Sequence, residues 1–438
     1  MSFFLPALFG WKARRLLRTL SGAFKSLSTR GLGDTLRVVR ERIRSTISSR
    51  TGHDLPTCST PGHSIAAHAT ILVLDAMMPD PARDSGSVRM LGMLSLMRSL
   101  GHEVAFFPNS GNSTNAEIGL LREMNVDVIG TGGMPSLPAW LKRHSSQLRA
   151  VIFSRHEVAE ANWQLISESA PNAARIFDTV DLHFLRLERE ARIQKSRKLM
   201  RLARLSRRQE LKFTQAADRV LVVSGSEKEL LSDIVPTAEI HILSNIHEVQ
   251  GCKTPYEQRQ GLLFVGGFGH SPNRDAVFWL LKEILPEIHR FLPETILHLV
   301  GDIPRDVISH LELKNVHLHG RVPSLRALME SSLVALAPLR AGAGVKGKIN
   351  SAMSHGLPVV ATSIAAEGMH LTDRHDVLVA DTPHQFAQAL IDLHTDDQLW
   401  RKLSANGMCN IQNYFSTEAA LTVLHKALPP VPPKSSAE

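Results

Sequence analysis

The sequence predicts an α/β protein made of two consecutive doubly wound domains, each a parallel sheet covered by helices on both faces. Three observations predict this class. Short apolar runs that end in polar or glycine residues recur through most of the chain, as buried parallel strands do. Segments with helical periodicity separate these runs, as the crossovers of a parallel sheet require. The alternation stops once, in a polar stretch at 250–260, and then starts again.

The first domain is expected over residues 69–248. Its opening run at 71–74 ends in Asp75, and a helix at 88–100 follows, with Gly101 as the usual glycine stop. Further strands are expected at 104–107, 126–129, 150–153, 175–177 and 219–223. One long polar helix rich in Arg and Lys is expected at 188–217. Its charge has two interpretations, a solvated helix face or a surface that meets phospholipid or a lipid diphosphate.

The second domain is expected over residues 261–428, after a linker at 249–260. Its strands are expected at 262–265, 296–300, 316–318, 334–337, 358–361 and 377–379. A closing helix at 416–428 can pack back on the first domain, and the proline-rich tail at 429–438 is expected to be disordered. Ligands of open parallel sheets bind beyond the carboxyl ends of the strands. We therefore expect two Rossmann-like domains that face each other across a cleft.

The composition is that of a globular protein with a charged leader. The chain has 438 residues and a hydrophobic fraction of 43%, enough for sizeable cores. Its net charge of +8 lies in residues 1–60, which hold eleven Lys and Arg against three Asp and Glu, while the rest holds 39 of each sign. The globular part is therefore neutral, which argues against a nucleic-acid-binding surface on it.

The N-terminal extension, residues 1–68, shows no run of 18 apolar residues and so predicts no transmembrane helix. Its apolar start precedes its basic residues, the reverse of a secretory signal, so we expect a cytoplasmic protein. The three cysteines lie far apart in the sequence, which excludes a disulfide framework and fits a reducing compartment. Residues 11–27 predict either a basic amphipathic helix in peripheral contact with the cytoplasmic membrane face or a disordered leader.

A first glycine turn stands directly after the run at 262–265. Gly266 and Gly267 let backbone N–H groups approach a phosphate, the helix start that follows favours negative charge, and Arg274 can add a direct contact. The alternative is a tight strand-to-helix turn with a capped helix. The turn is not a GxGxxG fingerprint.

A second glycine-rich segment, 342–348, follows the run at 334–337 and precedes a helix expected at 349–355. Gly344 keeps the backbone accessible, and Lys346 and Lys348 bring two positive charges to a helix N-terminus. This pattern predicts a diphosphate-binding site. The alternative is a flexible loop with solvated lysines. The segment is not a Walker A loop, because it lacks GK followed by Ser or Thr.

These segments resemble a known family. The stretch GAGVKGKINSAMSHGLPVVATSIAAEGM is similar to the donor-binding signature of GT-B glycosyltransferases of family 4, and so is LLFVGGFGHSPNRDAVFWLLKEILPEI. In the first half, IFDTVDLHFLRLERE and VLVVSGSEKELL look like members that act on surface polysaccharides such as O-antigen. The resemblance covers residues 70–425. It implies the GT-B fold and transfer of a sugar, with retention of configuration, from a nucleoside-diphosphate sugar to a lipid-linked or saccharide acceptor.

The resemblance also implies roles for individual residues of the second domain. The family places its nucleotide-diphosphate contacts on Gly266, Gly267, Lys346 and Lys348. It has two glutamates eight positions apart, of which the second holds the ribose. Here these positions are Ala343 and Ser351. Glu367 is a candidate to replace the ribose contact, and the alternative is that it caps the next helix.

In the first domain, the resemblance brings a glycine loop at Gly86 and a histidine at a strand end to the reacting sugar. Asp181 and His183 can position the acceptor hydroxyl or take its proton. The alternative is helix capping by Asp181 and packing of His183. Residues 154–157 are a weaker candidate for the same rim.

No metal site and no cofactor are expected. The 21 histidines include no HxxxH or HExxH pattern on a helix, and helix dipoles and lysines can stabilise a leaving diphosphate without metal. Two other functions stay open. One is another sugar-nucleotide enzyme of the same fold, such as an epimerase. The other is a non-catalytic partner in polysaccharide assembly, which the missing glutamate pair favours.

Overall fold

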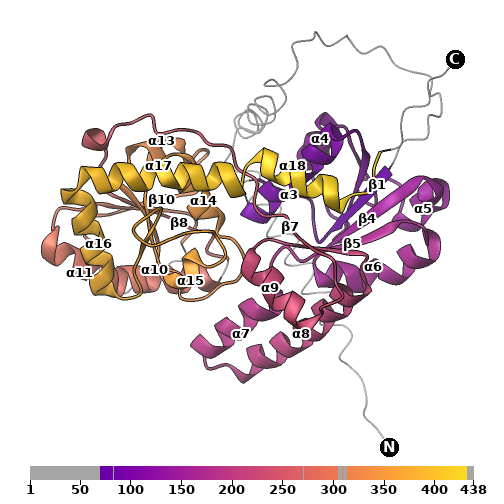
Figure 1. Ribbon diagram of the computed structural model, residues 1–438, viewed down its shortest axis with the longest axis horizontal. Helices are drawn as coiled ribbons and strands as arrows, with labels where there is room; N and C mark the ends of the chain where they lie inside the picture. The colour runs from indigo at the N-terminus through magenta and orange to yellow at the C-terminus, as the bar shows by residue number, and fades with distance from the viewer. Residues whose placement is uncertain (1–69, 82, 270, 304–307, 309–312, 432–438) are drawn as a thin grey trace, which may run out of the picture. The chain divides into compact units, whose positions relative to one another are not determined.

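The computed structural model describes residues 70–431 except 82, 270, 304–307 and 309–312. The basic N-terminal segment, with the helix predicted at 11–27, lies outside the described residues, and so does the end of the tail at 432–438. The described chain forms two parallel sheets with helices on their faces (Figure 1). The predicted α/β class with two doubly wound halves is confirmed.

The first sheet has seven parallel strands in the order β3-β2-β1-β4-β5-β6-β7. Its strands are β1 (Thr70–Asp75), β2 (Glu103–Pro108), β3 (Val126–Val128), β4 (Leu148–Ser154), β5 (Ala174–Asp178), β6 (Arg219–Val222) and β7 (Ile240–Ile242). The register between β1 and β4 pairs Leu72 with Val151 and Leu74 with Phe153, all fully buried. Each predicted strand of this half is present. The three-residue β7 was not predicted, because it is too short to show a period.

The helices of the first half alternate with these strands. They are α3 (Ser85–Ser99), α4 (Asn115–Glu123), α5 (Leu137–His144), α6 (His156–Ser169), α7 (His183–Ile193), α8 (Arg197–Ala216) and α9 (Gly225–Ile234), with a short 3₁₀ turn η1 (Ser145–Gln147) before β4.

The single long helix predicted at 188–217 is wrong, because the chain forms two helices, α7 and α8, that pack side by side (Figure 1). Lys195 adopts a left-handed conformation with φ of 48°, which ends helical geometry. Ser196 then caps α8, since its hydroxyl accepts a hydrogen bond from the backbone N–H of Leu199. The serine cap was the local signal for this break.

The second sheet has six parallel strands in the order β10-β9-β8-β11-β12-β13. They are β8 (Leu262–Val265), β9 (Leu297–Val300), β10 (Val316–Gly320), β11 (Val334–Ala337), β12 (Val359–Ala361) and β13 (Leu378–Val379). Its helices are α10 (Ser271–Trp279), α11 (Leu285–Phe291), α13 (Arg326–Ser331), α14 (Gly347–Ser354), α15 (Ser363–Ala366), α16 (Pro383–Thr395), α17 (Asp397–Tyr414) and α18 (Thr417–Ala427), with η2 (Tyr256–Gln258) before β8 and a π-helical turn η3 (Leu280–Ile284) between α10 and α11. The proposed linker at 249–260 lies between β7 and β8.

The last helix returns to the first sheet. α18 packs against α3 and β7, and the guanidinium of Arg219 donates to the carbonyl of Ala427 at 3.4 Å. The backbone N–H of His247 also donates to the carbonyl of Phe415 at 2.7 Å. Helix α18, which follows the second sheet in the sequence, therefore packs as a covering helix on the first sheet.

One buried ion pair fixes helix α3 on the first sheet. Arg89 donates two hydrogen bonds to the carboxylate of Asp178, at 2.8 and 2.9 Å, and further bonds to the carbonyl of Leu243. Both side chains are almost fully buried, and the bidentate geometry satisfies the charges that burial would otherwise leave uncompensated. This pair holds the N-terminus of α3 at the carboxyl end of β5. Among the described helices, none combines the length and the apolar character that a membrane span requires.

Candidate functional site

In each sheet the chain first adds strands on one side of its first strand and then crosses to add strands on the other side. This change of direction is the topological switch point of the sheet. β1 lies between β2 and β4, and β8 lies between β9 and β11. Ligands of doubly wound sheets bind beyond the carboxyl ends of the strands at such switch points. The loops that follow β1, β4, β8 and β11 are therefore the candidate site.

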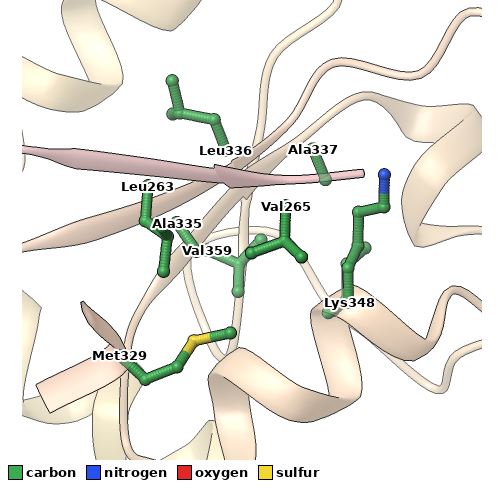
Figure 2. Close-up of a pocket in the computed structure, with 9 residues that line it drawn as sticks. Leu263, Val265, Met329, Ala335, Leu336, Ala337, Lys348 and Val359 are labelled. Carbon is green, nitrogen blue, oxygen red and sulfur yellow. The ribbon is translucent and has the colours of Figure 1, made fainter. Parts of the chain in front are cut away.

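The segment 342–348, which we call the lysine loop, enters α14 with Lys346 directly before the helix and Lys348 in its first turn. The amine of Lys346 donates to the carbonyl of Gly344 at 2.7 Å. The amine of Lys348 donates to the side-chain oxygen of Asn273 at 2.6 Å and lies 4.6 Å from the ring centre of Phe264. Figure 2 shows the Lys348 side chain extending from α14 toward the end of the strand that carries Ala337.

Burial makes both amines hold their protons weakly. It lowers the pKa of Lys346 from 10.5 to about 8, with Glu367 acting in the opposite direction. It lowers the pKa of Lys348 to about 7, and the neighbouring charge of Lys346 adds to this effect. An anion bound beside them would restore their usual affinity for protons. The pair is therefore suited to bind a negatively charged group at the N-terminus of α14.

A small cavity lies behind Lys348, inside the second half of the chain (Figure 2). It has a volume of about 10 Å³, which is at the lower limit for one water molecule. Its lining is apolar apart from Lys348 and consists of Leu263, Val265, Met329, Ala335, Leu336, Ala337, Ile349 and Val359. It is a void of the core and has no room for a nucleotide.

The glycine turn after β8 lies beside Lys348. A Cβ atom on Gly266 would lie 2.9 Å from the ring of Phe264, so a larger residue there would force that buried ring to shift. A Cβ atom on Gly267 would meet nothing within 4 Å, so the backbone is open on that side. Asn273 in α10 donates to the carbonyl of Gly267 at 2.8 Å and accepts from Lys348. The turn and the lysine loop are thus joined through one asparagine.

The lysine loop also contacts the first half of the chain. A Cβ atom on Gly344 would lie 3.2 Å from the Cβ atom of Asp181 and 3.2 Å from Val223. A Cβ atom on Gly347 would lie 2.5 Å from the Cβ atom of Ser85. The N-termini of α3 and α14 therefore meet, so the positive ends of two helix dipoles lie in one region.

Glu227 at the start of α9 is the buried acid of this region. Its carboxylate accepts from the backbone N–H groups of Leu182 and Val223, at 3.1 and 3.2 Å. Burial, together with the charge of Asp181, raises the pKa of Glu227 to about 7. The charge of Lys346 lowers the pKa of Glu227, and the charge of Glu227 raises the pKa of Lys346, so the two groups interact electrostatically.

Arg189 of α7 holds the loop and α15 together. It forms a bidentate ion pair with Glu367, which follows α15, and donates to the carbonyl of Gly342 at 2.6 Å. The hydrogen bonds from Arg189 lower the pKa of Glu367. Glu367 caps no helix N-terminus, so the capping alternative for it is wrong. The N-terminus of α15 is capped by Thr362, whose side chain accepts a hydrogen bond from the backbone N–H of Ala365.

Strained backbone marks the switch point of the first sheet. Arg155, after β4, has φ of 76° and forms an ion pair with Asp75 at the end of β1. Val180, after β5, has φ of 64°, a rare conformation for a β-branched residue. Such strain gathers at functional sites because the surrounding structure must enforce it.

His183 belongs to a cluster with His156 and Glu157. The Nδ1 atoms of His183 and His156 lie 3.3 and 3.4 Å from the carboxylate of Glu157, and the two rings meet edge to face. His156 Nδ1 also lies 3.5 Å from Glu210, and its other nitrogen lies 3.3 Å from the hydroxyl of Ser206. The side-chain bond to Glu210 and the charge of Glu157 raise the pKa of His156 against its desolvation.

This cluster is also the one group of three possible metal ligands among the described residues, with ligand atoms within 4.8 Å of one another. The arrangement is that of two imidazole rings, from His156 and His183, on either side of the carboxylate of Glu157. The pKa of Glu157 is correspondingly lowered to about 2, by His183 and His156 among other groups and against desolvation. The sequence had suggested no metal ligands here, because Glu157 and His183 lie on different helices.

The predicted residues are partly brought together. Gly266, Gly267, Lys348 and the loop with Gly344 and Lys346 lie in one region, and Asp181 lies against that loop. Asp181 pairs with Arg186 at 2.8 Å and makes no capping bond to α7, so its capping alternative is wrong. Gly86 lies in the first turn of α3, near Arg155.

The other two predicted residues lie on α10 and α14. Arg274 is exposed on α10. Ser351 lies in the last turn of α14, where its carbonyl accepts from His355 and Ser354. Sequence reasoning missed Arg189, Glu227 and Asp75, which act through partners far away in the sequence, so no local pattern could reveal them.

Comparison with known proteins agrees with this arrangement. Residues 259–396, which include the glycine turn and the lysine loop, match the family model described as glycosyl transferases group 1. An uncharacterised 44.6 kDa protein in the cps region of Klebsiella pneumoniae is 24% identical over 174 residues, which are 38% of this chain and 45% of that protein. The chain thus spans less than half the length of that relative.

Two solved structures share the fold. HepE of Anabaena, in complex with UDP and glucose, matches 82% of this chain and 99% of its own, with a TM-score of 0.59 and 15% identity. Sucrose-phosphate synthase of Thermosynechococcus elongatus matches 82% and 98%, with a TM-score of 0.61 and 16% identity. At such identities the likeness is one of fold. Residues 259–396 are thus a glycosyl transferases group 1 segment within a chain that has the GT-B glycosyltransferase fold.

Proposed function

We propose that this protein is a glycosyltransferase that moves a sugar from a nucleoside-diphosphate sugar to a lipid-linked or saccharide acceptor in surface polysaccharide biosynthesis. The observation that carries the proposal is the pair Lys346 and Lys348 at the N-terminus of α14, beside the glycine turn after β8. The group 1 match over 259–396 includes this region. Since HepE was solved with UDP and glucose, UDP is the first nucleotide to test.

The chemistry proposed for the second half is stabilisation of the leaving diphosphate. Negative charge develops on it as the bond to the sugar breaks, and Lys346, Lys348 and the free N–H groups of α14 are fixed there beforehand. Gly266 and Gly267 admit the backbone close to the phosphates, and Arg274 can join them from α10. These cations supply the charge that a divalent ion supplies in other transferases, so we propose transfer without metal or cofactor.

The first half is proposed to hold the acceptor. Asp181 lies against Gly344 with about a quarter of its side chain exposed, and it can orient an acceptor hydroxyl or accept its proton. His183, whose ring shares the carboxylate of Glu157 with His156, is a second candidate to take that proton. Gly86 lies in the first turn of α3 beside Arg155, and we assign it to the approach of the sugar. Retention of configuration and membership of family 4 rest on the sequence resemblance and are part of the proposal.

One observation favours a second candidate, a non-catalytic sugar-nucleotide-binding protein. The positions of the family's paired glutamates are Ala343 and Ser351, and the carboxylate of Glu367, the candidate replacement, is bound to Arg189. A ribose contact through Glu367 requires that this ion pair shares its carboxylate or opens. A binder without turnover would need no such rearrangement.

The test is binding followed by turnover. Melting temperature is measured with UDP, GDP, ADP and dTDP for the wild type, for Lys348→Ala and for the exposed-residue control Lys402→Ala. Saturable stabilisation by one nucleotide, weakened only in Lys348→Ala, supports the donor site. Release of that nucleotide from its sugar in the presence of acceptor, unchanged by EDTA, supports metal-independent transfer. Binding without any release supports the non-catalytic candidate, and no shift with any nucleotide would refute both.

A further inference from the structure

The outer face of the α7–α8 hairpin carries the densest positive charge of the described chain. Eight exposed Arg and Lys side chains lie within residues 192–208, and no Asp or Glu lies between positions 191 and 209. They are Arg192, Lys195, Arg197, Lys198, Arg201, Arg204, Arg207 and Arg208. None of them forms an ion pair with another described residue. We call these eight residues and the exposed apolar side chains among them the basic hairpin face.

The inner arginines of the same hairpin behave differently. Arg186 is paired with Asp181, and Arg189 is paired with Glu367. The hairpin thus pairs two of its arginines with acidic residues, whereas the eight exposed cations form no ion pair within the described chain.

Apolar side chains stand among these charges. Leu205 is 61% exposed, Leu202 is 44% exposed and Ile193 is 41% exposed. The buried side of α8 is formed by other residues, namely Ala203, Ser206, Glu210, Phe213 and Thr214. The exposed leucines are therefore not needed to hold α8 on the protein. A helix with cations and large apolar residues on its open side gains from a surface that accepts both.

We propose that the basic hairpin face docks this protein on an anionic lipid bilayer. The cations match the negative charge of phospholipid headgroups, and the leucines can enter the boundary between headgroups and acyl chains. A nucleic acid would match the cations alone and would leave the leucines exposed. The combination favours a membrane over a polyanion.

The α7–α8 hairpin borders the candidate site, so membrane docking through the hairpin would bring that site close to the bilayer. α7 contacts the lysine loop through the bond from Arg189 to Gly342, and Gln194 at the end of α7 donates to Ser271 at the start of α10, at 3.2 Å. A bilayer at the outer face of the hairpin would lie next to the helices that border the candidate site. If the function proposed above holds, a lipid-linked acceptor would reach the site from that bilayer. The docking itself does not depend on the chemistry.

The experiment is sedimentation of the full chain with vesicles, without donor or acceptor. Vesicles of phosphatidylcholine with phosphatidylglycerol are compared with vesicles of phosphatidylcholine alone. The variant Arg201→Glu/Arg204→Glu/Arg208→Glu reverses three charges of the basic hairpin face. Its control, Lys142→Glu/Arg143→Glu/Arg149→Glu, reverses three exposed charges elsewhere in the first half. Both change the net charge equally, and circular dichroism checks that both fold.

We expect the hairpin variant to lower the apparent affinity for anionic vesicles by about tenfold or more, while the control changes it less than about twofold. Leu205→Gln should also weaken binding, whereas Leu318→Gln, at a leucine that is 45% exposed on β10, should not. Equal losses in both triple variants would assign vesicle binding to the net charge of the chain and overturn the proposal. Unchanged vesicle binding by the hairpin variant would assign binding to other residues, such as 1–60, and would also overturn the proposal.

Discussion

Arg189 and Glu367 form a bidentate ion pair, with Nη1 2.5 Å from Oε2 and Nη2 2.8 Å from Oε1. Arg189 lies on α7, between strands of the first sheet, and Glu367 follows α15 in the second half. Because Arg189 also donates to the carbonyl of Gly342, a single guanidinium connects α7 to the lysine loop and to the residue that follows α15.

Replacing Arg189 with Gln should weaken nucleotide binding more than it weakens the fold. The pair is partly exposed, so its loss should cost less than about 1 kcal/mol of unfolding free energy. The lysine loop would lose the bond that orders it, and we expect nucleotide affinity to fall by about three- to tenfold, measured by calorimetry. Arg192→Gln, three residues further on α7 and exposed, is the control. Equal effects of the two substitutions would contradict the role given to Arg189.

Nucleotide binding should take up protons near neutral pH. The pKa values of Lys346 and Lys348 are about 8 and about 7 in the free protein, and a bound diphosphate raises both. Affinity should therefore be highest where both amines are protonated and should fall as pH rises from 7 to 9, by at most about tenfold per unit for each amine. Calorimetry in buffers of different ionisation enthalpy measures the uptake. Lys348→Met should reduce it, and an uptake of zero in the wild type would refute the assignment.

Glu227 should make stability depend on pH in a defined direction. Its pKa is raised from 4.5 to about 7 in the folded protein, so folding favours its protonated form. The resulting stabilisation is fully present below pH 4.5 and is lost as pH rises through 7, by at most about 3 kcal/mol. Urea unfolding between pH 5 and 7.5 should show a shallower decline for Glu227→Gln than for the wild type. The exposed neighbour substitution Glu229→Gln should leave the slope as it is, and the idea fails if both variants match the wild type.

Adding one methyl group at Gly347 should separate two helix starts. The new Cβ atom would lie 2.5 Å from the Cβ atom of Ser85, closer than real contacts allow. We expect Gly347→Ala to lower the melting temperature and to weaken nucleotide binding, and Ser85→Gly in the same chain to restore much of both. Gly119→Ala, where nothing lies within 4 Å, is the control and should not destabilise. Absence of rescue by Ser85→Gly would show that the contact is not the cause.

The fold was largely predictable because each buried parallel strand appears in the sequence as a short continuous run of apolar residues. Runs such as 71–74 and 262–265 are continuous and apolar, and their ends fall where hydrophobicity stops. The short β7 and the break at Lys195 escaped, since three residues show no period and a single left-handed residue leaves no composition signal.

The candidate site was predictable only where it is carried by contiguous residues. Lys346, Lys348 and the glycine turn belong to short segments whose residue types match phosphate binding. Arg189, Glu227 and Asp75 enter through partners 178, 45 and 80 positions away. Such contacts depend on the packing of whole helices, which no single segment encodes.

The return of α18 to α3 and β7 has a consequence for how the protein folds during synthesis. A ribosome releases residues 70–242 long before residues 417–427, so the first sheet emerges with part of its covering helix still untranslated. Contacts between such distant parts of a chain form late and leave apolar surface open in the meantime. The first half therefore cannot reach its final state as an independent nascent domain, and a stop codon before position 417 would leave α3 and β7 without the helix that packs against them.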